Sequence, residues 1–276
     1  MKNIIGVNTN SYHGFSLDEA LEGIAAAGFK YVELTAVRGW TEHVLSDMSD
    51  EQLNAVKEKC KKLDLTPFAL SGHCNLMSEE RLKDFEDNIE LASKLGCKYI
   101  ISSTGEAHFG ENESFADDVL VENVKRVLQK CIECNVKLAL EIHGEYGTGE
   151  SLKNIVDRVG SNLVGINYDT ANVVFYGRKL PEEDIKICVN QVNFVHLKDK
   201  AGAMDEWNFP AVGKGDLKLE AFIKYMDENG YEGPYSVEIE YTENFTMNEK
   251  KPGDLAIVNQ AVKDSYDYLK SIGVPV

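Results

Sequence analysis

Basic residues are scarce in this sequence. Its 276 residues include 29 Lys and Arg against 46 Asp and Glu, which gives a formal net charge of -17. Proteins bind nucleic acids and anionic membrane surfaces through clusters of Lys and Arg. The charge balance therefore argues against both partners, and it also disfavours a highly phosphorylated substrate.

Long apolar runs are absent as well. No stretch approaches the roughly 18 apolar residues that a membrane-spanning helix needs. The apolar run in MKNIIGVNTNSYHG, at the N-terminus, is far too short for the core of a signal peptide. We therefore expect a cytoplasmic protein that has no membrane partner.

The cysteines do not indicate a disulfide framework. They are scattered among apolar residues in a long chain, which is typical of reduced thiols in a protein core. Cys131 and Cys134 form a CxxC pair, a spacing found in redox sites and zinc sites, but no second pair follows. Because the pair falls in a segment with helical periodicity, we interpret it as structural. The six residues are Cys60, Cys74, Cys97, Cys131, Cys134 and Cys188.

A dinucleotide-binding fingerprint is also missing, because no GxGxxG follows the first predicted strand. The sequence instead alternates strand and helix patterns from end to end. Eight such units predict a parallel sheet closed into a (β/α)8 TIM barrel, an α/β fold, as a single domain over residues 1–276. An open, doubly wound sheet is the alternative. The predicted strands are 4–8, 31–36, 66–71, 98–103, 138–144, 163–169, 192–197 and 235–240.

Helix signals support this alternation. Ser16 with Glu19 has the spacing of a capping box at the start of a predicted helix, and so has Ser49 with Gln52. Pro181 is a favoured first-turn residue and begins a short helix after the sixth strand. The longest predicted loops follow the seventh and eighth strands, at the end of the barrel where active sites form.

Four potential metal ligands end apolar strands. In LALEIHG, three aliphatic side chains share one face of the predicted strand, and Glu141 and His143 share the other. The same arrangement recurs at Asp169 in GINYDTAN, at His196 in FVHLKD and at Glu238 in YSVEIEY. The intervals between the four residues are 28, 27 and 42 positions, and the first two match one strand–helix unit.

These four residues favour a metal site. A buried carboxylate is costly unless it is paired or holds a metal. Any one of the four could be a hydrogen-bonded or ion-paired barrel residue, but four at equivalent strand ends are better explained together. Three carboxylates and one imidazole suit one divalent ion, with Mn²⁺ first and Co²⁺, Mg²⁺ or Zn²⁺ as alternatives.

Several motifs together resemble a known family. GFKYVEL, LALEIHG, INYDTAN, VHLKD, VGKGDL and GYEGPYSVEIE are similar to segments of the sugar phosphate isomerase/epimerase group in the xylose isomerase-like barrel superfamily, which shares its fold with endonuclease IV. The resemblance covers essentially the whole chain. It implies that Glu141, Asp169, His196 and Glu238 are metal ligands and that the two glutamates are an acid/base pair. Asn172 is a departure, because many ketose 3-epimerases of the superfamily have DxxH where this sequence has DTAN.

This residue set suits a metal-dependent isomerase or epimerase of a ketose or keto-sugar. Such a reaction removes a proton α to a carbonyl, and a divalent ion stabilises the enediolate that forms. One carboxylate takes the proton and another returns one. A lyase or dehydratase of a keto-inositol or 3-keto-glycoside is the alternative, because it would use the same site. An activity like that of endonuclease IV is disfavoured by the acidic charge, and a non-catalytic sugar-binding barrel by the intact ligand set.

Further residues are candidates for substrate contact. Glu33 is predicted to point inward from the second strand. His73, His143, Asn172, Lys198 and Trp207 are predicted at strand ends or in the loops that follow, with Trp40 and Phe209 as additional aromatic cover for a sugar ring. Glu240 is predicted to be a polar neighbour of the site. The loop histidines His13, His43 and His108 are weaker candidates.

The loops at the predicted site are acidic. A phosphate could use backbone groups at Gly213 and Gly215 in the loop after the seventh strand. Asp205 and Glu206 precede them in that loop, and Glu240 and Glu243 follow the eighth strand, so a dianion would meet an unfavourable field there. We therefore expect a neutral keto-sugar or keto-polyol as the small-molecule partner. A homo-oligomer is compatible with the sequence.

Overall fold

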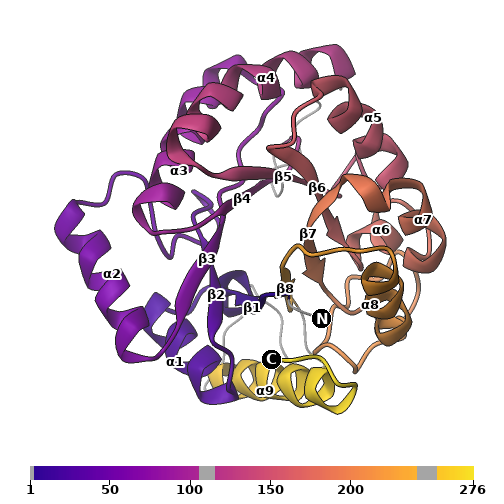
Figure 1. The fold of residues 1–276 in the computed structure, drawn as a ribbon. Helices are drawn as coiled ribbons and strands as arrows, with labels where there is room; N and C mark the ends of the chain where they lie inside the picture. The colour runs from indigo at the N-terminus through magenta and orange to yellow at the C-terminus, as the bar shows by residue number, and fades with distance from the viewer. Residues whose placement is uncertain (1–2, 106–115, 241–253) are drawn as a thin grey trace.

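The computed structural model describes residues 3–105, 116–240 and 254–276, and its eight parallel strands form a closed barrel in sequence order (Figure 1). The first and last strands pair with each other, with Gly6 opposite Ser236. The predicted (β/α)8 barrel is thus confirmed, and the open-sheet alternative is wrong. The strands are β1 (Ile5–Asn8), β2 (Tyr31–Thr35), β3 (Thr66–Ser71), β4 (Tyr99–Ser102), β5 (Lys137–Glu141), β6 (Val164–Asp169), β7 (Val192–Leu197) and β8 (Tyr235–Val237).

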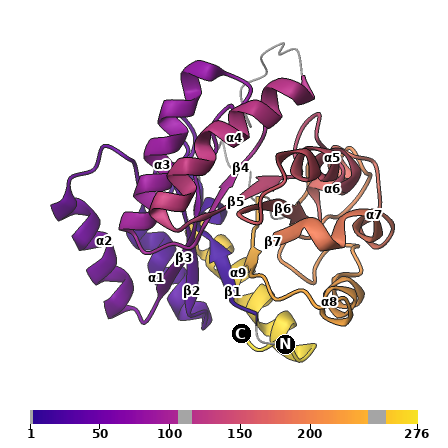
Figure 2. The same cartoon turned by 45° about the horizontal axis from the view of Figure 1, so that its top comes forward.

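Helices surround the strands, with α3 and α4 on one side of the barrel and α7 and α8 on the other (Figure 2). Among the helices of the described residues, none is long and apolar enough to cross a membrane. The α-helices are α1 (Leu17–Ala27), α2 (Asp50–Lys62), α3 (Leu82–Lys94), α4 (Asp117–Cys134), α5 (Gly149–Val159), α6 (Asn172–Phe175), α7 (Pro181–Cys188), α8 (Leu219–Glu228) and α9 (Asp254–Ser271). Short 3-10 helices are η1 (Thr9–Tyr12), η2 (Glu79–Arg81) and η3 (Val189–Gln191).

Helix starts follow the predicted signals. Ser16 and Ser49 form capping boxes at the first turns of α1 and α2, and Pro181 is the first residue of α7. The short α6, directly after β6, was not predicted. It matters for the site because it begins at Asn172.

Two strands end earlier than predicted. β5 ends at Glu141 and β8 at Val237, whereas the other six strands begin and end within one residue of the prediction. After β8 the backbone N–H of Ile239 donates to the Ser11 hydroxyl at 3.0 Å, so a side chain takes the place of a neighbouring strand. The polar residues after these strands therefore lie on loop backbone.

Alternate residues of the strands enter two apolar layers. Leu138 and Leu140 of β5 belong to the large core between barrel and helices. Ala139 belongs to a small inner cluster with Phe68 and Phe194, whose rings stack 5.8 Å apart. This inner layer fills the barrel below the strand ends, and the Phe194 ring meets the ring of His196 edge-on at 5.7 Å. The apolar layer is thus the floor of the candidate site.

The cysteines have no disulfide partners. All six are free thiols. Cys131 is buried in the last turn of α4, where burial raises the pKa of its thiol to about 12, and Cys134 ends the helix. The structure thus supports the interpretation of the CxxC pair as structural.

Candidate active site and metal centre

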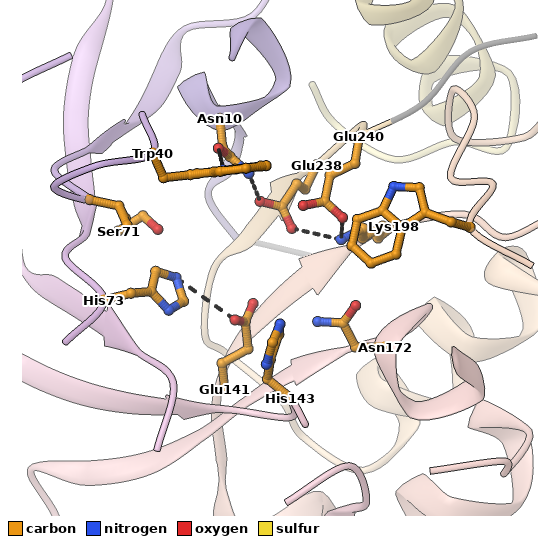
Figure 3. Close-up of a pocket in the computed structure, with 12 residues that line it drawn as sticks. Asn10, Trp40, Ser71, His73, Glu141, His143, Asn172, Lys198, Glu238 and Glu240 are labelled. Carbon is orange, nitrogen blue, oxygen red and sulfur yellow. Dashed lines mark hydrogen bonds and ion pairs between the residues drawn. The ribbon is translucent and has the colours of Figure 1, made fainter. Parts of the chain in front are cut away.

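A pocket opens at the carboxyl ends of the strands, and the space between its atoms, open solvent included, is about 370 Å³. Its side chains come from loops and strand ends on several sides of the barrel and converge on one space (Figure 3). Carboxylates, imidazoles, an ammonium group and two indoles border the pocket, so it offers both charged and aromatic contacts. The lining residues are Asn10, Val37, Trp40, Ser71, His73, Glu141, His143, Asn172, Lys198, Trp207, Glu238 and Glu240.

The four predicted metal ligands come together at the base of this pocket. Glu141, Asp169, His196 and Glu238 are all buried, and each offers a ligand atom within 4.8 Å of the others. The His196 Nδ1 atom lies 2.5 Å from Glu141 Oε1, 3.5 Å from Glu238 Oε2 and 3.9 Å from Asp169 Oδ2. Three carboxylates and one ring nitrogen therefore face a common point.

Asp169 shows that this cluster fits a cation. Its Oδ1 atom accepts the backbone N–H groups of Ala171 and Asn172, at 2.8 and 2.7 Å. Its Oδ2 atom is buried and accepts no hydrogen bond, although an ionised carboxylate needs partners for both oxygens. Burial, together with the charges of Glu141 and Glu238, raises the pKa of Asp169 to about 7. A divalent ion would give Oδ2 a partner and offset the repulsion, so these residues fit the implied metal.

Glu238 is held on both of its oxygens. Oε1 accepts hydrogen bonds from the side-chain amides of Asn8 and Asn10, at 3.0 and 3.2 Å. Oε2 lies 3.3 Å from the Lys198 ammonium and faces His196. Burial works against the charged form of Glu238, but Lys198 and His196 outweigh it and lower its pKa.

Glu141 is held on one side and faces the pocket on the other. Its Oε1 atom accepts from the Asn167 amide at 3.2 Å, beside the contact with His196. Its Oε2 atom lies 3.7 Å from His73 Nε2. Burial opposes ionisation, but His196 and His73 outweigh it and lower the pKa of Glu141 well below its ordinary value. The backbone N–H of Ser103 donates to His73 Nδ1 at 2.9 Å, so a neutral His73 carries its proton on Nε2 and directs it towards Glu141.

Lys198 is the ammonium group of the pocket. It is 2 % exposed and pairs with Glu240, with Glu238 at 3.3 Å and with Asp169 at 3.8 Å. Its Nζ atom also lies 4.5 Å from the centre of the Phe209 ring. Burial favours the neutral amine, but Glu240, Glu238 and Asp169 outweigh it and raise the pKa of Lys198 well above its ordinary value.

Five of the six residues predicted to contact substrate line the pocket, and Glu33 does not. Glu33 points into the barrel as predicted, but it is fully buried, and both of its oxygens lie 3.2 Å from His196 Nε2. The two-residue period of a strand predicts on which face of the sheet a side chain lies. It does not predict how deep inside the barrel that side chain is buried. The remaining five are His73, His143, Asn172, Lys198 and Trp207.

Two indoles border the pocket. Trp40 stacks on His13 with ring centres 4.1 Å apart, and its Nε1–H donates to Asn10 Oδ1 at 3.2 Å. Trp207 is 40 % exposed and meets the rings of Phe175 and Phe209 edge-on. These neighbours fix the planes of both indoles, which leaves flat apolar surface beside the polar groups.

The structure also places residues that sequence reasoning missed. Asn8 and Asn10 hold Glu238, Asn167 holds Glu141, and the Tyr176 hydroxyl lies 3.0 Å from Nε2 of the pocket residue His143. Burial lowers the pKa of His143 to about 4. A signal was present for the asparagines, because Asn8 ends a strand and Asn167 shares the phase of Asp169. His13 and His43 do not line the pocket, and His108 and Glu243 lie outside the described residues.

Comparisons with known proteins give one family and several similar proteins. A family model described as xylose isomerase-like TIM barrel matches residues 21–272. An inosose dehydratase from Clostridium perfringens is 27 % identical over 191 residues, which is 59 % of this chain and 64 % of that protein. D-psicose 3-epimerase from Clostridium cellulolyticum, solved with D-tagatose, superposes with a TM-score of 0.77 at 16 % identity over the full length of both chains. A xylose isomerase-like barrel protein from Mycobacterium smegmatis, solved in complex with magnesium, has a TM-score of 0.76 at 16 % identity, covering 99 % of this chain and 98 % of that one.

Proposed function

This chain belongs to the xylose isomerase-like TIM barrel family, and we propose from that premise that it is a divalent-metal-dependent isomerase or epimerase of a ketose or keto-sugar. One observation carries the proposal: three buried carboxylates and a buried imidazole converge at the base of the pocket, and Asp169 Oδ2 accepts no hydrogen bond there. We further propose that the enzyme works in the cytoplasm, where its six thiols remain reduced.

Glu141, Asp169, His196 and Glu238 would hold the metal. An oxygen-rich set with one nitrogen suits Mn²⁺ best among common ions, and Co²⁺, Mg²⁺ and Zn²⁺ remain alternatives. The bound ion supplies positive charge that offsets the negative charge developing on the carbonyl oxygen of the substrate.

The two glutamates are the proposed proton carriers. Glu141 Oε2 faces the pocket beside His73, so it can accept a proton from the carbon next to the carbonyl. Glu238 borders the same pocket from the far side of the cluster, where it can return a proton to the opposite face. His73 can donate its Nε2–H to a substrate oxygen, because Ser103 occupies the other ring nitrogen.

The pocket suits a neutral keto-sugar or keto-polyol. Among the described residues that line it, Lys198 is the one Lys or Arg side chain, and carboxylates already surround it. Among these described lining residues, a phosphate would therefore meet three carboxylates and no cation outside an ion pair. His143, Asn172 and Lys198 can bind hydroxyl groups, and Trp207 offers a face for the C–H side of a ring.

A second candidate is elimination on a keto-inositol or 3-keto-glycoside, and the asymmetry of the two glutamates favours it. Glu238 Oε1 is occupied by two amide donors and Oε2 faces the cluster, whereas Glu141 Oε2 faces the pocket. One base is sufficient for elimination if another group protonates the leaving oxygen. The relative from Clostridium perfringens is named as an inosose dehydratase, which agrees with this candidate.

The test combines metal analysis with product analysis. Glu141→Gln and Asp169→Asn should each reduce the Mn²⁺ content of the purified protein, and undiminished content in both would refute the metal site. The Mn²⁺-loaded wild type is then incubated in D₂O with D-psicose, an inosose and a 3-keto-glycoside, and products are followed by proton NMR. Epimer with deuterium next to the carbonyl supports the main proposal, and loss of water to an enone or its 1,2-dione tautomer, or release of the aglycone, supports elimination. No turnover and no deuterium exchange on the panel would favour a non-catalytic sugar-binding barrel.

A further inference from the structure

Glu33 is a buried carboxylate that the proposed chemistry does not use. It lies in β2, is fully buried, and does not line the pocket. Both of its oxygens are 3.2 Å from His196 Nε2. Among the described residues the structure gives this carboxylate no other hydrogen-bond or ion-pair partner. A buried carboxylate with a single partner lowers the stability of the fold, so we expect Glu33 to have a function in the site.

The two nitrogens of the His196 ring face different carboxylates. Nδ1 faces the cluster of Glu141, Asp169 and Glu238, and Nε2 faces Glu33. An ionised carboxylate can only accept a hydrogen bond, so the contact with Glu33 requires a proton on Nε2. A neutral imidazole carries one proton. With that proton on Nε2, the lone pair of Nδ1 points at the common point of the three carboxylates.

The rest of the His196 environment fixes its backbone and ring plane. Its backbone N–H donates to Asn167 Oδ1 at 2.9 Å, and the Phe194 ring lies edge-on to the imidazole. Neither contact distinguishes Nδ1 from Nε2 as the protonated atom. Without a metal, the contact of Nδ1 with Glu141 Oε1 at 2.5 Å calls for a proton on Nδ1 by the same argument, and a bound metal would take the place of that proton. Glu33 is the group that keeps the other proton on Nε2.

We propose that Glu33 is a positioning residue that fixes the His196 tautomer and thereby makes Nδ1 the metal-ligating atom. The assignment rests on the proposed metal site and adds a residue to it. A carboxylate behind a ligating imidazole also increases the basicity of the ligand, and loss of such a partner commonly weakens metal binding about 10–100-fold. Glu33→Gln keeps the shape, but its NH₂ group can donate to Nε2, which would shift the proton to Nδ1 and block the ligand atom.

The experiment reads the metal and the ring directly and needs no substrate. Mn²⁺ affinity is measured by calorimetry for the wild type, Glu33→Gln, Glu33→Asp and a matched control, Asp184→Asn. Asp184 is also a buried carboxylate, but it accepts hydrogen bonds from the Gly149 backbone N–H at the start of α5 and from the Tyr168 hydroxyl in β6. Separately, wild-type protein with ¹⁵N-labelled histidine is loaded with ¹¹³Cd²⁺ and examined by NMR.

We expect cadmium coupling to Nδ1 of His196, a proton on its Nε2, a 10–100-fold weaker Mn²⁺ affinity in Glu33→Gln, and wild-type affinity in Asp184→Asn. Glu33→Asp keeps a carboxylate acceptor, but its shorter side chain places the acceptor farther from Nε2. Its Mn²⁺ affinity should therefore lie between those of the wild type and Glu33→Gln. Cadmium coupling to Nε2 would overturn the assignment without any variant. So would Mn²⁺ affinity in Glu33→Gln within twofold of the wild type. A wild type that binds no Mn²⁺ would overturn the metal site itself, and this assignment with it.

Discussion

Lys198 gives the sharpest test of the electrostatics of this site. Its ammonium is 2 % exposed and lies among three carboxylates, with Glu240 as its ion-pair partner, Glu238 at 3.3 Å and Asp169 at 3.8 Å. Of the lining residues that the structure describes, Lys198 is the one Lys or Arg side chain. Lys198→Met keeps most of the apolar stem and removes the charge.

The expected loss of stability is large. Removal of one partner from a buried ion pair costs about 3–5 kcal/mol, because the remaining charge is left without compensation. For a domain of this size, roughly 2–4 °C of melting temperature corresponds to each kcal/mol, so Lys198→Met should melt roughly 6–20 °C lower. Lys198→Met/Glu240→Gln removes both members of the principal pair. The double variant should therefore recover at least half of the loss, which a double-mutant cycle expresses as a coupling energy.

Urea unfolding followed by circular dichroism, with EDTA or with Mn²⁺, measures these differences. At a Mn²⁺ concentration about 100-fold above the dissociation constant, the wild type should gain about 2.7 kcal/mol. Lys198→Met should gain at least as much, because the cluster becomes more negative when the ammonium is removed. A loss below about 1 kcal/mol in the single variant, or a double variant no more stable than the single one, would refute the reasoning.

Three further predictions concern pH, proton transfer and substrate charge. Burial lowers the pKa of His43 to about 4, so on acidification the His43 imidazole is protonated in the unfolded chain before it is protonated in the folded one. The free energy of unfolding that His43 contributes is complete above about pH 6.5 and should fall towards pH 4, by about 2 kcal/mol at pH 5. Urea unfolding at pH 7.5 and pH 5 should show a larger loss in the wild type than in His43→Gln, and equal losses would contradict the prediction. Glu141→Gln and Glu238→Gln should each lose about 10²–10⁴-fold in turnover at full metal loading; a near-normal rate in Glu238→Gln alone would favour the one-base elimination. Paired kinetics on a neutral keto-sugar and its phosphate ester should favour the neutral form in kcat/KM, and a tenfold preference for the ester would disprove the neutral-substrate assignment.

The fold could be predicted because its signals are local and repeated. Each strand–helix unit carries its own apolar periodicity, and helix starts such as Ser16 and Ser49 carry capping residues in the sequence itself. The ends of β5 and β8 were predicted too late because apolar alternation continues past Glu141 and Val237 while the hydrogen-bond partners change. Ser11, which takes over after β8, is 228 positions away in sequence, and no local pattern reveals such a partner.

The cluster of potential ligands could be predicted from the sequence, but the residues that support it could not. Parallel strands bring their carboxyl ends to one rim, so Glu141, Asp169 and His196 meet wherever the barrel closes. Which amide supports which carboxylate depends on the order of the strands around the ring. Asn8 reaches Glu238 because β1 pairs with β8, a contact that exists only in the closed barrel.

The position of Asn167 depends on a register shift between two strands, which the periodicity of the sequence does not reveal. The register between β6 and β7 shifts between Ile166 and Asn167, and such irregularities in a sheet re-aim side chains next to functional sites. At this point the backbone N–H of His196 donates to the Asn167 side-chain oxygen at 2.9 Å, while the Asn167 amide donates to Glu141 Oε1 at 3.2 Å. One side chain thus fixes the height of the histidine and the orientation of a glutamate on another strand. The register beyond the shift places Asp169 opposite His196. The ligand geometry therefore comes from an interruption of the strand pattern, whereas the ligand identities come from the pattern itself.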